Sequence, residues 1–323
     1  MKSRAAAADR RHFDSRGHKG AAQRRERIAA RLFTGVLYVC CLVFLLVLGG
    51  LAITLLWKSR LSLATFGPEF LWSSEWDPVH GRFGAAPFLY GTMVSSLLAL
   101  LLAGSIGLLA GVFLAEFAPR RLGAALGAMI ELLAAVPSIV YGLWGLFVLA
   151  PFVGGWLGPA LQAAFGFLPI FQGPIYGVSM LTAALVLSVM IVPTIAAITR
   201  DLIAATPMRY REASLALGAT RWETIAKVLI PEVRGGIFGA CMLALGRALG
   251  ETIATTMVIG NRPAIAASLL APGYTVASVI ANEFTEATSD LYLSALIELG
   301  LILLLISLLV VGIGRLMLRL VVR

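Results

Sequence analysis

The sequence predicts an all-α, polytopic membrane protein with six transmembrane helices. Hydrophobic residues make up 59% of the 323 residues and charged residues only 13%, whereas a soluble domain averages about 45–50% and about 25%. The apolar residues gather in six long runs, and about 20 residues are enough to cross a hydrocarbon core of about 30 Å. The net charge is +9, and the Lys and Arg residues responsible for it lie beside these runs. Because the positive-inside rule accounts for such charge, we expect no nucleic-acid partner.

The expected elements follow from where apolar and polar segments alternate. Residues 1–31 hold ten Lys and Arg residues and no apolar periodicity, so this basic cytoplasmic tail is expected to be irregular or to lie on lipid head groups. Residues 58–88 form a polar, periplasmic loop, and 151–174 form an uncharged loop rich in Gly, Pro and aromatic residues. A core of five spans, residues 89–323, includes a charged loop at 200–234. The six spans are expected at residues 32–57, 89–114, 122–150, 175–199, 235–260 and 291–316.

Charge predicts the orientation of these spans. If the N-terminus lies in the cytoplasm, the segments on that side hold 21 Lys and Arg residues, and the outer loops hold four. Those four are Lys58, Arg60, Arg82 and Arg262. Because positive loops remain on the cytoplasmic side, we expect both termini and the loop 200–234 to be cytoplasmic.

The segment from Arg211 to Pro231 is polar and amphipathic, unlike the spans on both sides of it. It reads REASLALGATRWETIAKVLIP. Gly218 interrupts the helical pattern, since glycine costs about 1 kcal/mol in a helix relative to alanine. Pro231 is expected to block helical continuation into the next span. The pattern predicts two short helices joined at Gly218 that lie outside the bilayer between two spans, and by itself it indicates no more than an ordinary amphipathic loop.

This segment resembles the signature of integral permeases of bacterial ABC importers: Glu-Ala-Ala, three residues, Gly, nine residues and Ile-x-Leu-Pro. The matching residues are Glu212, Ala213, Ser214, Gly218 and Val228-Leu229-Ile230-Pro231. Ser replaces the second Ala, and Val and Ile replace Ile and Leu, with size or apolar character kept. The resemblance implies a type I ABC importer permease fold in a bacterial inner membrane. It also implies that this loop is the coupling helix, which docks on a separate ATPase.

Four ionisable residues fall within the expected spans: Glu131, Arg247, Glu251 and Glu298. A charge at the bilayer centre costs about 2.5–3.5 kcal/mol on insertion scales, so such residues usually face a pathway or a partner. Arg247 is expected near mid-membrane, with Glu251 four residues later on the same helix face. A guanidinium suits a tetrahedral oxyanion, and Glu251 would orient it. The alternatives stay open: a self-neutralising pair for these two, and structural contacts for Glu131 and Glu298.

Two further stretches resemble the PstC family, the permease subunits of phosphate ABC importers. One reads LGRALGET from Leu245 to Thr252; the other has EWDP from Glu75 and FGAAPFLYGT from Phe83. The resemblance covers about residues 30–320. It implies inorganic phosphate as the substrate and three kinds of partner: a PstA-like permease subunit, a PstB-like ATPase dimer and a periplasmic phosphate-binding protein.

Other functions receive less support from the residues. No Gly-x-x-x-x-Gly-Lys-Ser/Thr phosphate loop occurs, so ATP and Mg²⁺ are expected on the partner ATPase and no cofactor on this chain. The three Cys lie in apolar runs and the three His are scattered, so we expect neither a metal site nor catalytic residues. A membrane-embedded transferase and an ion-coupled transporter are therefore weaker alternatives, and a permease for another tetrahedral oxyanion, such as arsenate or phosphonate, remains open.

Overall fold

The structure is a computed structural model that describes the backbone of residues 2–321 and the side chains of residues 30–119 and 121–318. Apart from loops and one isolated bridge between Asp77 and Arg82, this part of the chain is helical, mostly α-helical with short 3-10 and π-helical turns. As expected, it contains six helices that are long and apolar enough to cross a membrane. They are Ala30–Lys58, Ala86–Phe117, Ser138–Phe165, Met180–Ala205, Arg221–Leu249 and Asp290–Leu318. The chain divides into two compact units, Met1–Thr54 and Leu55–Arg323.

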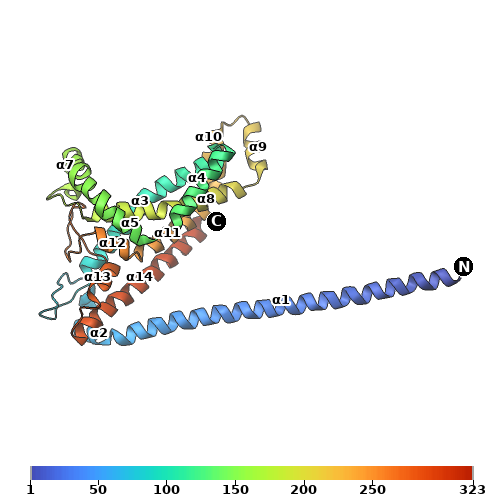
Figure 1. Ribbon diagram of the computed structural model, residues 1–323, viewed down its shortest axis with the longest axis horizontal. Helices are drawn as coiled ribbons and strands as arrows, with labels where there is room; N and C mark the ends of the chain where they lie inside the picture. The colour runs from blue at the N-terminus through green and yellow to red at the C-terminus, as the bar shows by residue number, and fades with distance from the viewer. Residues whose placement is uncertain (1, 322–323) are drawn as a thin grey trace. The chain divides into compact units, whose positions relative to one another are not determined.

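The basic segment before the first span is helical, so the expectation of an irregular tail was wrong. Helix α1 runs without a break over Lys2–Lys58 (Figure 1). The segment is rich in Ala, Arg, Lys, Gln and Glu, which are strong helix formers, and the adjoining span spares it the cost of nucleation. Apolar periodicity indicates that one face of a helix is buried, not whether a helix forms. The lack of such periodicity in residues 1–31 was therefore no evidence against a helix.

Helix α8 (Met180–Ala205) lies at the centre of the second unit, between α3 (Ala86–Val112) and α11 (Ile230–Leu249) (Figure 1). Their shared core consists of Ala99, Ala103, Leu187, Ile191, Ile195, Ala244 and Ala248. Small residues on α3 let α8 approach closely. A Cβ added to Gly107 would lie only 2.8 Å from that of Ile195, and one added to Gly111 only 2.6 Å from that of Thr199. Helices in membranes commonly pack through such small residues.

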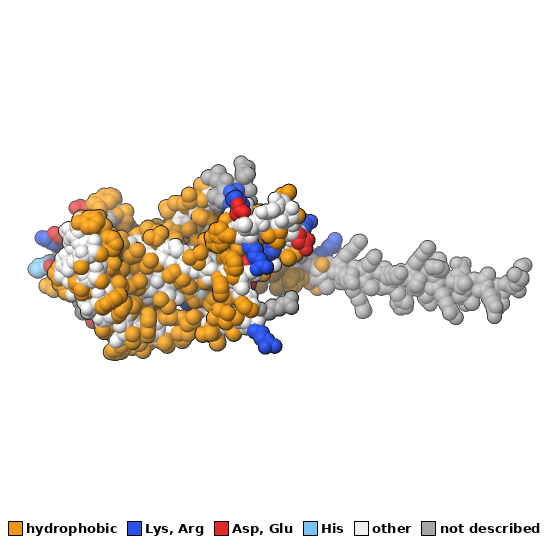
Figure 2. All heavy atoms as spheres, turned by 90° about the horizontal axis from the view of Figure 1, so that it is seen from above, with side chains coloured by type: hydrophobic (Ala, Val, Ile, Leu, Met, Phe, Trp, Pro, Cys, Tyr) orange, Lys and Arg blue, Asp and Glu red, His pale blue; other side chains and the backbone are white. Residues whose placement is uncertain are grey.

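The surface of the second unit is suited to lipid. Figure 2 shows hydrophobic side chains over the middle of the visible face, with charged side chains gathered toward two ends. Leu101 and Leu109 are 68% and 61% exposed. Monomeric soluble proteins rarely expose apolar patches of this extent, whereas hydrocarbon tails solvate them without penalty. The surface therefore agrees with the predicted membrane protein.

The third span begins further along the chain than the expected range, 122–150. Helix α4 (Arg120–Ala135) ends before Pro137, because a proline disfavours helical geometry at the residue before it. Most of the expected loop 151–174 is therefore helical. The span Ser138–Phe165 consists of α5 (Ser138–Trp144), η3 (Gly145–Leu149), α6 (Ala150–Phe152), η4 (Val153–Leu157) and α7 (Gly158–Phe165). A short turn η5 (Pro169–Phe171) follows.

The fifth span also differs from its expected range, 235–260. Helix α10 (Arg221–Thr224), the π-helical turn η6 (Ile225–Leu229) and α11 continue without interruption. Pro231 therefore does not block the helix, contrary to the prediction. It follows the wide turn η6, in which the Ile230 N–H bonds to the Ile225 carbonyl, so the missing N–H of proline falls where the bonding pattern is already interrupted. At its other end the span stops at Leu249, and a separate short helix α12 (Ile253–Val258) follows.

The remaining elements lie at opposite ends of the second unit. Helix α9 (Met208–Ala216) and α10 form one end (Figure 1). At the other end lie α13 (Val276–Glu283) and the segment before α3, which contains α2 (Arg60–Phe66) and the 3-10 turn η1 (Gly67–Leu71). Helix α3 ends in a π-helical turn, η2 (Phe113–Phe117). Helix α14 (Asp290–Val321) is the last span and contributes Tyr292, Leu296 and Leu299 to the core beneath α13.

Candidate functional site

The two short helices predicted around Gly218 are present as α9 and α10. Gly218 has a φ of +85° and nothing within 4 Å of where a Cβ would lie. Glycine is therefore needed for its backbone conformation rather than for space, since a left-handed conformation strains most other residues. The Gly218 N–H bonds to the Leu215 carbonyl and the Ala219 N–H to the Ser214 carbonyl, which closes α9 before the chain reverses.

A capping box starts the second helix. The Thr220 hydroxyl accepts from the Glu223 N–H over 3.2 Å, and Glu223 Oε2 accepts from the Thr220 N–H over 3.0 Å. Lys227 adds an exposed ion pair with Glu223 at 2.9 Å. The pattern Thr-x-x-Glu before an apolar run is a sequence signature of such a start, although the sequence analysis did not use it.

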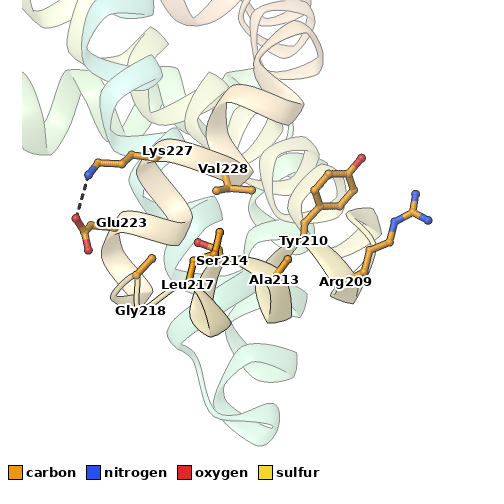
Figure 3. A pocket seen from close by; sticks show the side chains of 10 residues that line it. Arg209, Tyr210, Ala213, Ser214, Leu217, Gly218, Glu223, Lys227 and Val228 are labelled. Atoms are coloured by element: carbon orange, nitrogen blue, oxygen red, sulfur yellow. Dashed lines mark hydrogen bonds and ion pairs between the residues drawn. The ribbon is translucent and has the colours of Figure 1, made fainter.

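The two helices enclose an open groove of about 830 Å³, shown in Figure 3. A hydrogen bond between the Ser214 and Thr224 hydroxyls, 3.0 Å long, joins the helices across the turn. Leu217 is 89% exposed. The lining residues are Arg209, Tyr210, Ala213, Ser214, Leu217, Gly218, Ala219, Glu223, Lys227 and Val228. An exposed leucine in one groove with Tyr210 and Arg209 is a composition suited to a protein partner, because tyrosine and arginine are enriched at protein interfaces.

The structure places three of the five predicted coupling residues at this groove. Ala213, Ser214 and Gly218 line it, whereas Glu212 and Pro231 do not. Glu212 is exposed on α9, and Pro231 lies beyond η6 at the start of α11. The groove also includes Arg209, Tyr210 and Lys227, which the signature did not contain.

Sequence reasoning missed the ion pair between Arg211 and Glu116. Nη2 of Arg211 lies 2.6 Å from Oε1 of Glu116, and both side chains are largely shielded, at 14% and 17% exposed. Glu116 belongs to η2 and Arg211 to α9. The pair therefore attaches the predicted docking element to the end of α3.

The four residues predicted to line a substrate pathway do not form one cluster. Arg247 is exposed in the last turn of α11 and makes no ion pair with the described residues. Glu251 lies beyond the end of that helix, where its Oε1 accepts from the Ala254 N–H of α12 over 3.3 Å. The expectation that both residues point from one helix face was therefore wrong, because the helix ends at Leu249.

Glu131 and Glu298 occupy two further environments. Glu131 of α4 is 63% exposed and pairs with Arg200 of α8 at 3.1 Å, which is a contact between two helices. Glu298 of α14 is 3% exposed, and its Oε2 has no hydrogen-bond partner in the described part of the chain. Within that part, no group of three or more His, Cys, Asp and Glu residues could hold a metal ion.

Comparison with known proteins identifies the family. A family described as "binding-protein-dependent transport system inner membrane component" matches residues 107–323. The chain belongs to this family. Its curated relatives in the family include the "Phosphate transport system permease protein PstC" of Mesorhizobium japonicum, which is 45% identical over 307 residues, 94% of each chain. Proteins of the same name in Xylella fastidiosa and Pasteurella multocida are 42% and 46% identical, over 90% and 85% of this chain and 90% and 87% of their own.

A solved structure supports the fold of this family member. It is an inward-facing conformation of the MetNI methionine ABC transporter, with a TM-score of 0.54 and 19% sequence identity. The likeness covers 73% of this chain and 95% of the compared chain. It shows that the chain has the type I ABC importer permease fold.

Proposed function

We propose that the chain is the permease subunit of an ATP-driven phosphate importer, which passes inorganic phosphate from a periplasmic binding protein into the cytoplasm. The observation that carries the proposal is the similarity to permeases named PstC, at 42–46% identity over 85–94% of this chain. The similarity extends over most of this chain and most of each relative rather than one short segment. It therefore supports the substrate class as well as the fold.

The groove between α9 and α10 is the proposed docking site for a PstB-like ATPase dimer. Leu217 and Trp222 are exposed apolar side chains at this end, at 89% and 60%. Tryptophan is among the residues that dominate the binding energy of protein interfaces, and Leu217 adds apolar area at the same end. Since the chain has no phosphate loop of its own, ATP and Mg²⁺ are assigned to the partner, and this chain needs no cofactor.

The remaining partners and the orientation follow from the same proposal. A PstA-like permease subunit completes the pathway, and a periplasmic phosphate-binding protein delivers phosphate at the end formed by α13 and the segment before α3. The loop 200–234 holds six Lys and Arg residues, which favours its cytoplasmic location and, with it, cytoplasmic termini in the inner membrane. Arg247 is the proposed contact for the crossing anion, because its guanidinium has no described ion-pair partner and suits a tetrahedral oxyanion.

The test is phosphate uptake by the reconstituted transporter. The four components are placed in liposomes with ATP on the ATPase side and labelled phosphate with the binding protein on the other. We expect uptake that requires both ATP and the binding protein, and that stops with an ATPase subunit unable to hydrolyse ATP. ATP-driven uptake of sulfate, a phosphonate or another oxyanion without phosphate uptake would assign a different substrate. Uptake that is independent of the ATPase would refute the importer proposal.

A further inference from the structure

Arg211 joins three segments that come from different parts of the chain. Its Nε and Nη2 donate to Oε1 of Glu116 over 2.9 and 2.6 Å. Nη2 also donates to the Ile203 carbonyl, and Nη1 donates to the Thr206 carbonyl, each over 2.8 Å. Glu116 lies in η2, the turn in which α3 ends, while Ile203 and Thr206 lie at the end of α8. One guanidinium therefore connects α9 with the ends of both core helices.

The chemistry of Arg211 suits this position. The last carbonyls of a helix lack partners within it and carry partial negative charge, and arginine presents several donors in a planar fork. The Arg211–Glu116 pair is also the least exposed of the described ion pairs. Shielding from water and salt lets such a pair persist where exposed pairs exchange with solvent.

Helix α9 has no apolar anchor of comparable strength. None of its residues is buried, whereas η6, which continues α10, buries Ile225 and Leu229. These two side chains pack against Val112 of α3 and Ile203 of α8. The second half of the docking element is thus held by hydrophobic packing, and the first half depends on polar contacts, among which those of Arg211 reach the core helices directly.

We propose that Arg211 and Glu116 are positioning residues that make α9 move together with α3 and α8 when a docked ATPase subunit moves. The proposal rests on the proposed function, because it requires an ATPase at the groove beside α9. With the contacts intact, a displacement of α9 reaches the ends of α3 and α8. Without them, the connection at Pro207 between α8 and α9 bends instead, and ATP hydrolysis proceeds without transport.

The experiment uses the complete transporter in liposomes with four variants: Glu116→Gln, Arg211→Gln, both together, and Arg211→Lys. Three quantities are measured for each: ATPase subunit retained on purification, ATP hydrolysis, and phosphate imported per ATP hydrolysed. We expect retention and hydrolysis close to the wild type. The ratio of phosphate to ATP should fall by about tenfold or more in Arg211→Gln, since several hydrogen bonds from a charged group are lost. It should fall less in Glu116→Gln, which keeps an oxygen that can accept from Arg211 and leaves both carbonyl contacts in place. The double variant should have the same ratio as Arg211→Gln alone, because residue 116 has already lost its partner in Arg211→Gln.

Arg211→Lys keeps the charge opposite Glu116. It therefore still tests the proposal if the glutamine variants fail to fold. One ammonium cannot reproduce the fork that reaches Glu116 and both carbonyls, so an intermediate ratio is expected. Arg121→Gln is the matched control, because it removes an exposed arginine at the start of α4, and it should keep the wild-type ratio.

The possible results separate the two proposals. A wild-type complex without ATP-driven uptake would refute the proposed function itself. If the wild type imports phosphate but the variants lose their ATPase subunit, the two residues serve docking and the positioning proposal is wrong. It is also wrong if Arg211→Lys keeps the wild-type ratio, or if adding Glu116→Gln to Arg211→Gln lowers the ratio further. Retained docking and hydrolysis, with a ratio that is lowered in Arg211→Gln and no lower in the double variant, supports it.

Discussion

Trp76 donates its indole N–H to Oε2 of Glu283 over 2.8 Å, and so joins the segment before α3 to the end of α13. The Tyr292 hydroxyl donates to the same oxygen over 2.5 Å, and the Tyr274 hydroxyl donates to Oε1 over 3.3 Å. Burial raises the pKa of Tyr274 well above its usual value, and the nearby Glu283 adds to the effect. A tyrosine hydroxyl is protonated at ordinary pH in any case, and the raised pKa keeps this one able to donate in more alkaline solution.

The first prediction concerns the contribution of this network to stability. Trp76→Phe keeps an aromatic ring beside Phe83 and Phe88, whose ring centroids lie 4.9 and 4.7 Å away, but removes one donor from Glu283. A hydrogen bond to a charged group contributes about 1.5–3 kcal/mol, so we expect a clear drop in the thermal midpoint of the purified protein. Trp72→Phe is the control, because the Trp72 side chain is 66% exposed. Equal midpoints for both variants would contradict the assigned role.

The sequence predicted features that depend on residues near each other in the chain. The turn at Gly218 is one, since a glycine between two amphipathic segments predicts a break whatever surrounds it. The acidic partners of Arg211 and Trp76 are different, because they lie 95 and 207 residues away. No local pattern indicates which acidic residue an arginine or an indole will meet after folding.

Helix ends inside apolar runs were also beyond the sequence pattern. Apolar residues continue on both sides of Pro137, so composition did not reveal that a helix stops near it, and the charges of Arg247 and Glu251 within an otherwise apolar segment did not reveal the helix end at Leu249. Gly250 did not identify the second end either, since glycine is frequent within transmembrane helices. The error had a consequence at the site, because Arg247 and Glu251 share a face only if the helix continues past Leu249.

The second prediction tests the orientation. In a background with Cys40, Cys41 and Cys241 replaced by alanine, single cysteines are introduced as Val79→Cys and Leu217→Cys. The native side chains are 88% and 89% exposed, so both cysteines should be reactive. In intact cells, a membrane-impermeant thiol reagent should label the first and not the second, and after lysis and removal of the docked ATPase subunit it should label both. Labelling at residue 217 in intact cells would reverse the proposed topology.

The third prediction concerns the conformation at Gly218. Gly218→Val forces a β-branched residue into a left-handed backbone conformation, which costs about 1–3 kcal/mol and should displace α10 relative to α9. We expect loss of the ATPase subunit on purification and loss of phosphate uptake. Gly218→Asn is the matched control, because asparagine tolerates positive φ and should retain most of both. If the valine variant behaves like the asparagine variant, the turn conformation is not required for docking.

The fourth prediction separates Arg247 from Glu251. Because Glu251 lies beyond the helix end and accepts from the Ala254 N–H, Glu251→Gln keeps an oxygen that can still accept this bond. We therefore expect normal assembly and substantial uptake. Arg247→Gln removes the donor fork from the proposed anion contact. Since a hydrogen bond to a charged group contributes about 1.5–3 kcal/mol, uptake normalised to assembled complex should fall by about tenfold or more.

Combining the two substitutions distinguishes an anion contact from a self-neutralising pair. If the two charges only balanced each other, removing both would leave neither uncompensated and would restore uptake. An arginine that contacts the crossing phosphate has no substitute in the double variant, so uptake should remain as low as in Arg247→Gln. The measurement is ATP-driven phosphate uptake in liposomes with equal amounts of assembled complex. Recovery in the double variant would assign Arg247 a structural role and leave the anion contact to other residues.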